Sequence, residues 1–133
     1  MSLLRIPTSL PDDLEDVVHR TIGACIAVHA ELGPGLLENL YSRAVAAELS
    51  FLGIPFDLER VFPVDYRGAV IGHHRLDLLV DSRIVVEIKA VERLSPIHVS
   101  QVISYLKVSR AKVGLLMNFN SELLRQGLKR IVL

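Results

Sequence analysis

The sequence predicts a single α/β domain in which a mixed sheet is flanked by helices. The first observation is the order of patterns: two helical segments, three strand-like runs, a third helical segment and a further apolar strand. The second is that a chain of 133 residues, 50% of them apolar, can bury a core without metal or disulfides. We expect an N-terminal tail over residues 1–10 and one domain over 11–133, because no repeat or linker-like stretch divides the chain.

Two helices are predicted first. From Pro11 to Leu32, apolar residues recur at steps of three and four, which is typical of a helix with one buried face. The "GPG" motif at 33–35 ends this helix, because proline cannot continue it and glycine adopts unusual backbone angles. A second helix follows over about 36–52 and ends before Gly53.

Three strands are predicted next. The first is "DLERVFPVDY" at 57–66, and the other two lie within "HHRLDLLVDSRIVVEIKA" at 73–90. We expect the latter two to form a hairpin closed by Asp81, Ser82 and Arg83. Val80 then lies opposite Ile84.

This register is selected by side-chain alternation. One face becomes wholly apolar: Leu76, Leu78, Val80, Ile84, Val86 and Ile88. The other face carries Arg75, Asp77, Leu79, Val85, Glu87 and Lys89, with Asp77 opposite Glu87 and Arg75 opposite Lys89. A two-residue loop would instead mix charged and aliphatic side chains on both faces.

The C-terminal third predicts a helix, a buried strand and a short tail. Ser95 is a favourable N-cap with Pro96 at the first helical position, so we expect a helix over 95–109. "KVGLLMNF" at 112–119 is typical of a buried strand, and 121–133 predicts a helical turn followed by an edge strand.

Composition excludes several classes of protein. No segment approaches the length of a membrane span, and the N-terminus lacks the apolar core of a signal peptide, so we expect a cytoplasmic protein without membrane contact. Cys25, the single cysteine, is expected to be a buried thiol. The net charge is zero, but residues 1–59 carry three basic against nine acidic residues and 60–133 carry twelve against six, which allows a basic surface.

The predicted hairpin places two acids side by side. Like charges directly opposite, with Cβ atoms about 4.5–5.5 Å apart, destabilise a sheet. Lys89, two residues from Glu87 on the same face, could compensate. A magnesium ion could also compensate, because it prefers carboxylate oxygens together with substrate phosphate. The alternative is an ion-pair cluster of Arg75, Asp77, Glu87 and Lys89 on a solvated sheet face.

Asp77 on one strand, followed by "EIK" at 87–89 on the next, resembles the PD-(D/E)xK nuclease superfamily, although Leu76 replaces the proline of that name. "GPGLLENLY" at 33–41, with Gly35, Glu38 and Tyr41, is similar to the motif of the bacterial GxxExxY family within that superfamily. The motifs "RLDLLV", "VVEIKAVERL", "QVISYL" and "GLLMNF" extend the resemblance over residues 14–131.

The resemblance implies a restriction-endonuclease-like fold and a set of site residues. Asp77, Glu87 and the carbonyl of Ile88 would hold Mg²⁺, or alternatively Mn²⁺, with Glu38 as a third carboxylate. Lys89 would orient water or stabilise charge on the phosphate. Gln101 and Tyr105 match a Q-x-x-x-Y pattern whose side chains approach the metal and substrate; a buried hydrogen-bonding pair is the alternative.

The implied function is Mg²⁺-dependent hydrolysis of nucleic-acid phosphodiesters, with DNA favoured over RNA. One alternative is a catalytically silent module that binds nucleic acid or protein, and another is a purely structural domain. Because the chain is small and has no separate substrate-binding domain, we expect a homodimer or a partner protein to supply selectivity. "HHR" at 73–75 does not predict a zinc site, since adjacent strand residues face opposite ways.

Overall fold

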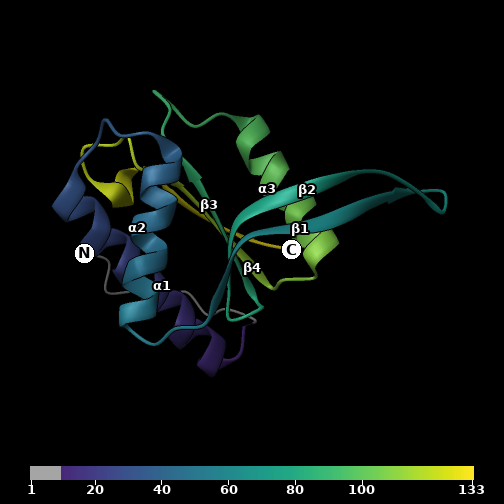
Figure 1. Cartoon of the computed structure of the whole chain (residues 1–133), viewed down its shortest axis with the longest axis horizontal. Helices are drawn as coiled ribbons and strands as arrows, with labels where there is room; N and C mark the ends of the chain where they lie inside the picture. The colour runs from purple at the N-terminus through teal and green to yellow at the C-terminus, as the bar shows by residue number, and fades with distance from the viewer. Residues whose placement is uncertain (1–9) are drawn as a thin grey trace.

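A computed structural model describes residues 10–133 (Figure 1), so all but the last residue of the predicted tail lies outside the described residues. The helices are α1 (Asp12–Leu32), α2 (Glu38–Phe51), α3 (Pro96–Ser109) and the short 3₁₀ helix η1 (Leu124–Gly127). The strands are β1 (Phe56–Tyr66), β2 (Ala69–Val80), β3 (Ile84–Lys89), β4 (Val113–Asn118) and β5 (Leu128–Val132). The predicted α/β fold with a mixed sheet is confirmed.

The five strands form one sheet in the order β1-β2-β3-β4-β5. Neighbouring strands are antiparallel except β3 and β4, which are parallel and are joined through α3. A parallel pair needs such a crossover connection, because a tight turn cannot return the chain to the same end of the sheet.

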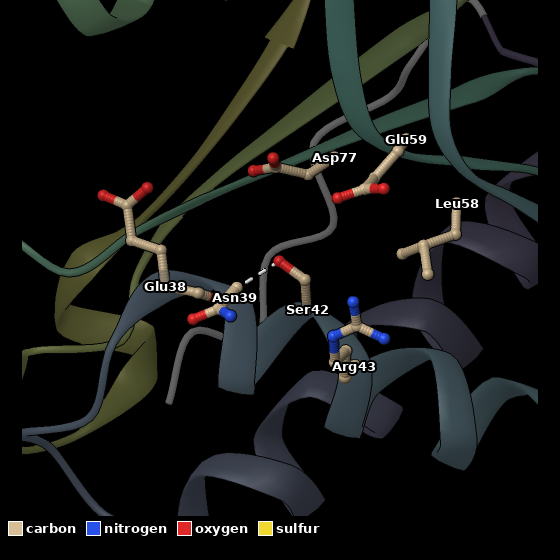
Figure 2. Close-up of a pocket in the computed structure, with 7 residues that line it drawn as sticks. All are labelled: Glu38, Asn39, Ser42, Arg43, Leu58, Glu59 and Asp77. Atoms are coloured by element: carbon tan, nitrogen blue, oxygen red, sulfur yellow. Dashed lines mark hydrogen bonds between the residues drawn. The ribbon is translucent and has the colours of Figure 1, made fainter.

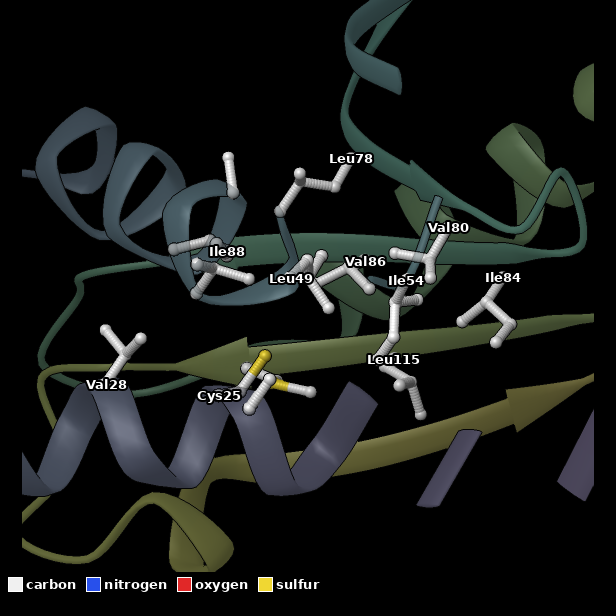
Figure 3. Close-up of a cluster of buried hydrophobic side chains, with 14 of the residues drawn as sticks. Cys25, Val28, Leu49, Ile54, Leu78, Val80, Ile84, Val86, Ile88 and Leu115 are labelled. Carbon is white, nitrogen blue, oxygen red and sulfur yellow. The ribbon is translucent and has the colours of Figure 1, made fainter. Parts of the chain in front are cut away.

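Helices cover both faces of this sheet. On one face, α1 and α2 pack on a large core; Figure 3 shows Cys25 and Val28 of α1 and Leu49 of α2 against Val86 and other strand residues. On the other face, α3 packs on a smaller cluster: Leu76, Leu79, Val85, Val102, Leu106, Ala111 and Leu116. β3 and β4 are therefore buried on both sides, which explains their almost unbroken apolar sequences.

The predicted hairpin register is confirmed for the part of the hairpin that forms a ladder. Val80 pairs with Ile84, and the ladder continues to Leu78 and Val86, where it ends. Asp81 and Ser82 adopt positive φ values of 53° and 58°, so the loop closes without glycine. The arginine of this loop, Arg83, bonds the carboxylate of Asp81 and thereby stabilises the turn.

The prediction for Leu76 is wrong. This residue packs in the α3 cluster with Leu79, whereas Leu78 packs under α1 and α2. The alternation of side chains between the two faces is interrupted at Asp77, where the pairing of β2 with β3 ends. On the other neighbouring strand, β1, the residue opposite Asp77 is Glu59, which has a φ of 56°. The predicted pairs Asp77–Glu87 and Arg75–Lys89 are consequently absent from the ladder, and the polar face is shorter than expected.

β1 and β2 form a long hairpin that extends beyond the rest of the sheet (Figure 1). β2 begins at Ala69, four residues earlier than position 73. The connection is the two-residue turn Arg67–Gly68, with φ values of 50° and 84° that suit the twist of a hairpin. No helix within residues 10–133 has both the length and the apolarity needed to cross a membrane.

Candidate active site

The site is centred where β2 and β3 separate. Asp77 is the residue next to Leu78, whose pairing with Val86 is the last of the β2–β3 ladder. Its Oδ2 accepts a hydrogen bond from the backbone N–H of Ile88 at 2.8 Å. The side chain of β2 thus continues the contact with β3 after the backbone ladder has ended. Burial is the largest cause of a raised pKa for Asp77, which the Ile88 hydrogen bond partly opposes.

Glu87 lies beside Asp77 and is 5% exposed. Burial and the neighbouring Asp77 charge raise the pKa of Glu87 to about 8. Its Oε1 is buried and has no hydrogen-bond partner among residues 10–133, although a buried carboxylate oxygen normally has one. The two acids that the hairpin register predicted to be neighbours are therefore brought together, and one oxygen of the pair is available to a ligand.

Lys89 supplies the nearest positive charge. Its Nζ lies 3.6 Å from Glu87 Oε2, and both side chains are largely buried, at 16% and 6% exposure. At this separation the ion pair is loose, so the ammonium group can still interact with another anion. The alternative cluster is only partly present, since no ion pair of Arg75 is found within residues 10–133.

Glu38 is held beside this strand end by the loop before α2. Tyr41 is fully buried; its hydroxyl donates to the carbonyl of Gly33 at 2.5 Å and accepts from the N–H of Leu36 at 3.1 Å. This clamp fixes the loop before the first residue of α2, Glu38, whose Oε1 accepts from the N–H of Ala90 at 3.2 Å. Tyr41 is therefore a packing and positioning residue.

A pocket lies between α2 and the β1–β2 hairpin (Figure 2). Helix α2 contributes Glu38, Asn39, Ser42 and Arg43, and the strands contribute Leu58, Glu59 and Asp77. In the close-up, Asp77 lies between Glu38 and Glu59, with Arg43 on the opposite side of the pocket. Apart from Glu38 and Asp77, the pocket residues could not be predicted from the sequence. Helix and strand periodicity does not show which turn of α2 packs against which part of the β1–β2 hairpin.

Helix α3 faces the acids from the other side of the sheet. Burial and the charges of Glu87 and Asp77 raise the pKa of Tyr105 to about 12, which places the phenol in their electrostatic field. Gln101, one turn earlier, has a buried Oε1 without a hydrogen-bond partner. Among residues 10–133, Gln101 Oε1 therefore makes no hydrogen bond to Tyr105.

The histidines do not form a metal centre. His74 Nε2 lies 2.8 Å from Ser104 Oγ, and its ring packs edge-on against Tyr105. His98 belongs to the capping box of α3, where its Nδ1 accepts from the N–H of Ser95. His29 is buried against the carbonyl of Ser121. These contacts give His29, His74 and His98 structural roles.

The chemistry of the acid pair fits a hard divalent cation. Two adjacent carboxylates whose burial disfavours ionisation, one with an unpartnered oxygen, suit an ion that prefers oxygen ligands. Within residues 10–133, however, no group of three or more His, Cys, Asp or Glu side chains is close enough to hold a metal. Asp77 and Glu87 therefore form a pair of neighbouring acids, and Glu38 lies outside it.

The sheet order, the crossover helix and the acid pair at the divergence of two strands define a restriction-endonuclease-like protein. A family model described as the PD-(D/E)XK nuclease superfamily matches residues 15–131. The chain belongs to the PD-(D/E)XK nuclease superfamily, whose members typically use divalent metals and act on nucleic acid. No curated protein matches the chain.

Proposed function

We propose that this protein is a metal-dependent nuclease that hydrolyses nucleic-acid phosphodiesters, with DNA as the favoured substrate and Mg²⁺ or Mn²⁺ as the cofactor. The observation that supports it most strongly is the buried pair Asp77 and Glu87 beside Lys89, with Glu87 Oε1 lacking a partner. Burying two acids costs stability, and a site for a cation gives a reason for keeping them. The GxxExxY family is the proposed subgroup, and residues 11–133 are the proposed domain.

In this proposal Asp77, Glu87 and the carbonyl of Ile88 hold the cation, and Glu38 adds a third carboxylate from α2. A bound divalent ion supplies Lewis-acid activation of the phosphate and of water. The hydrogen bond from Ile88 holds the Asp77 carboxylate in place before any ligand arrives. To join the group, Glu38 would exchange its bond with the Ala90 N–H for the cation.

Lys89 acts on the substrate in this proposal. Its ammonium group lies 3.6 Å from Glu87, so it can orient the attacking water or stabilise negative charge that develops on the phosphate. Gln101 and Tyr105 approach the same centre from α3, and the amide N–H of Gln101 and the hydroxyl of Tyr105 would donate to phosphate oxygens of the substrate backbone. Substrate would therefore contact both α2 and α3, with the acids between them.

The second candidate function is a silent module that binds nucleic acid or protein without cutting. It is favoured by the absence, within residues 10–133, of a ready group of three metal-binding side chains. A homodimer or a partner protein that supplies selectivity is part of both proposals.

The test is cleavage of single-stranded, duplex and branched DNA and RNA with Mg²⁺ or Mn²⁺, comparing wild type with Glu87→Ala and Lys89→Ala. Glu92→Ala is the matched control, since Glu92 is an exposed glutamate in the loop after β3. The nuclease proposal expects metal-dependent cleavage in wild type and the control, reduced by about two orders of magnitude or more in the two site variants. Binding of DNA by wild type without any cleavage would favour the silent module.

A further inference from the structure

We propose that the α2 side of the pocket is a phosphate-binding subsite in which Arg43, assisted by Asn39, holds a nucleic-acid phosphate next to the one that is cut. This inference rests on the proposed nuclease function and assigns residues that neither the motifs nor the family resemblance include. It also predicts the path of the substrate backbone, which would run from Asp77 and Glu87 into the pocket between α2 and the β1–β2 hairpin.

Arg43 lies in the same pocket as one acid of the proposed metal site. Arg43 and Asp77 line the same pocket, one from the helix and the other from the strand (Figure 2). Because Asp77 also belongs to the acid pair, a backbone bound at the acids passes directly into this pocket. A phosphate group there would lie within the space that Arg43 borders.

Arg43 also brings positive charge to a pocket with several acids. Of the described residues that line the pocket, Arg43 alone is basic, whereas Glu38, Glu59 and Asp77 are acidic. A polyanion needs a fixed positive charge to enter such a space, and guanidinium groups bind phosphate with two parallel hydrogen bonds. The side chain is exposed, and among residues 10–133 it makes no ion pair and no hydrogen bond, although acids line the same pocket.

Arg43 has a polar neighbour on the same helix. Asn39 lies four residues earlier, so the two side chains share a helix face, and Asn39 lines the same pocket. Its amide can donate to a phosphate oxygen without adding charge. Ser42 cannot serve in the same way while its hydroxyl donates to the carbonyl of Glu38. The subsite therefore combines one cationic and one neutral donor.

The experiment is fluorescence anisotropy of a short fluorescein-labelled DNA oligonucleotide, single-stranded and duplex, in EDTA, so that cleavage does not enter the measurement. Wild type, Arg43→Ala, Arg43→Lys and Asn39→Ala are titrated at several salt concentrations. Arg125→Ala is the matched control, because Arg125 is also an exposed arginine whose side chain makes no ion pair among residues 10–133, and it does not line the pocket. Circular dichroism verifies that each variant is folded.

We expect Arg43→Ala to weaken binding about tenfold and to lower the slope of log K against log[salt] by roughly one. Arg43→Lys should keep the salt slope but recover only part of the affinity, since lysine cannot bind bidentately. Arg125→Ala should match wild type. If Arg43→Ala and Arg125→Ala have equal affinity and equal slope, the subsite is refuted, even where wild type cleaves DNA and the nuclease function stands. If wild type binds none of the oligonucleotides and cleaves no substrate, both proposals fail together.

Discussion

The carboxylate of Asp77 accepts a hydrogen bond from the backbone N–H of Ile88 at 2.8 Å, just beyond the end of the backbone ladder between β2 and β3. The Asp77 side chain thus accepts the hydrogen bond that a backbone carbonyl of β2 would accept in a regular ladder. A buried N–H without a partner would be costly, so the fold itself requires an acceptor at this position. The acid is consequently oriented toward Glu87 by folding, before any ligand binds.

This relationship predicts different stabilities for two neutral substitutions of Asp77. Both Asp77→Ala and Asp77→Asn remove the charge, but asparagine keeps an oxygen that can accept from Ile88. We expect the alanine variant to have a free energy of unfolding about 1–2 kcal/mol lower than the asparagine variant. Urea denaturation at equal pH measures the difference. Equal stability of the two variants would show that the hydrogen bond contributes nothing to the fold.

The raised pKa of Glu87 predicts how metal-free stability depends on pH. The folded protein holds a proton up to about pH 8, whereas the unfolded chain releases it near the ordinary value of 4.5. Because the folded state binds more protons across this interval, its stability is greatest at the acidic end and falls as pH rises toward 8. Each pKa unit corresponds to about 1.4 kcal/mol, so the loss is on the order of a few kcal/mol.

Glu87→Gln removes this titration. We expect its melting temperature in EDTA to change less between pH 5 and pH 8 than that of wild type, and to exceed it at the upper end. Differential scanning fluorimetry across that range is the measurement, with Glu92→Gln as the control because Glu92 is exposed. A wild-type curve that stays parallel to the Glu87→Gln curve would contradict the assignment of a raised pKa.

Added metal is predicted to reverse the destabilisation. A divalent ion that binds only the folded state adds about 2.7 kcal/mol when its concentration is about 100 times Kd. Binding should tighten as pH rises, since both carboxyls must ionise before they coordinate a cation. We expect Mg²⁺ or Mn²⁺ to raise the melting temperature of wild type and Glu92→Ala, but not of Asp77→Ala or Glu87→Ala. Equal shifts in all four proteins would indicate that the metal binds elsewhere.

Tyr41→Phe tests the clamp at the start of α2. The substitution removes the hydrogen bonds with Gly33 and Leu36 and leaves the ring packing against Phe119 intact. We expect a loss of about 1–3 kcal/mol in the free energy of unfolding and faster amide exchange at Leu36. Ser42→Ala, which removes a single hydroxyl bond on the same helix, is the milder comparison. If Tyr41→Phe loses no more stability than Ser42→Ala, the Tyr41 hydrogen bonds do not hold the loop before α2 in place.

Much of the fold follows from side-chain alternation and helix periodicity. The register from Val80–Ile84 onward could be predicted because only one pairing separates charged from apolar residues. The error at Leu76 arises because alternation assumes a regular strand, whereas the backbone turns at Asp77 opposite the positive φ of Glu59. The Arg67–Gly68 turn depends on a similar left-handed conformation, which arginine rarely adopts.

Only part of the candidate site could likewise be predicted from the sequence. Asp77, Glu87 and Lys89 could be found from the sequence because neighbouring strands bring them together at short separation along the chain. Glu38 was reached only through the resemblance to a family motif. Arg43 and Glu59 carry no signal of their own, since the pocket that they share is formed by the packing of α2 on a distant hairpin.

The most direct test of the central claim is a crystal structure of the protein soaked with Mn²⁺, with anomalous scattering used to locate the ion. We predict an anomalous peak in contact with the carboxylates of both Asp77 and Glu87, and no such peak in Glu87→Ala crystals treated identically. A well-ordered wild-type structure in which these two carboxylates remain without metal, or in which Mn²⁺ binds only at other positions, would contradict the proposed metal-dependent nuclease.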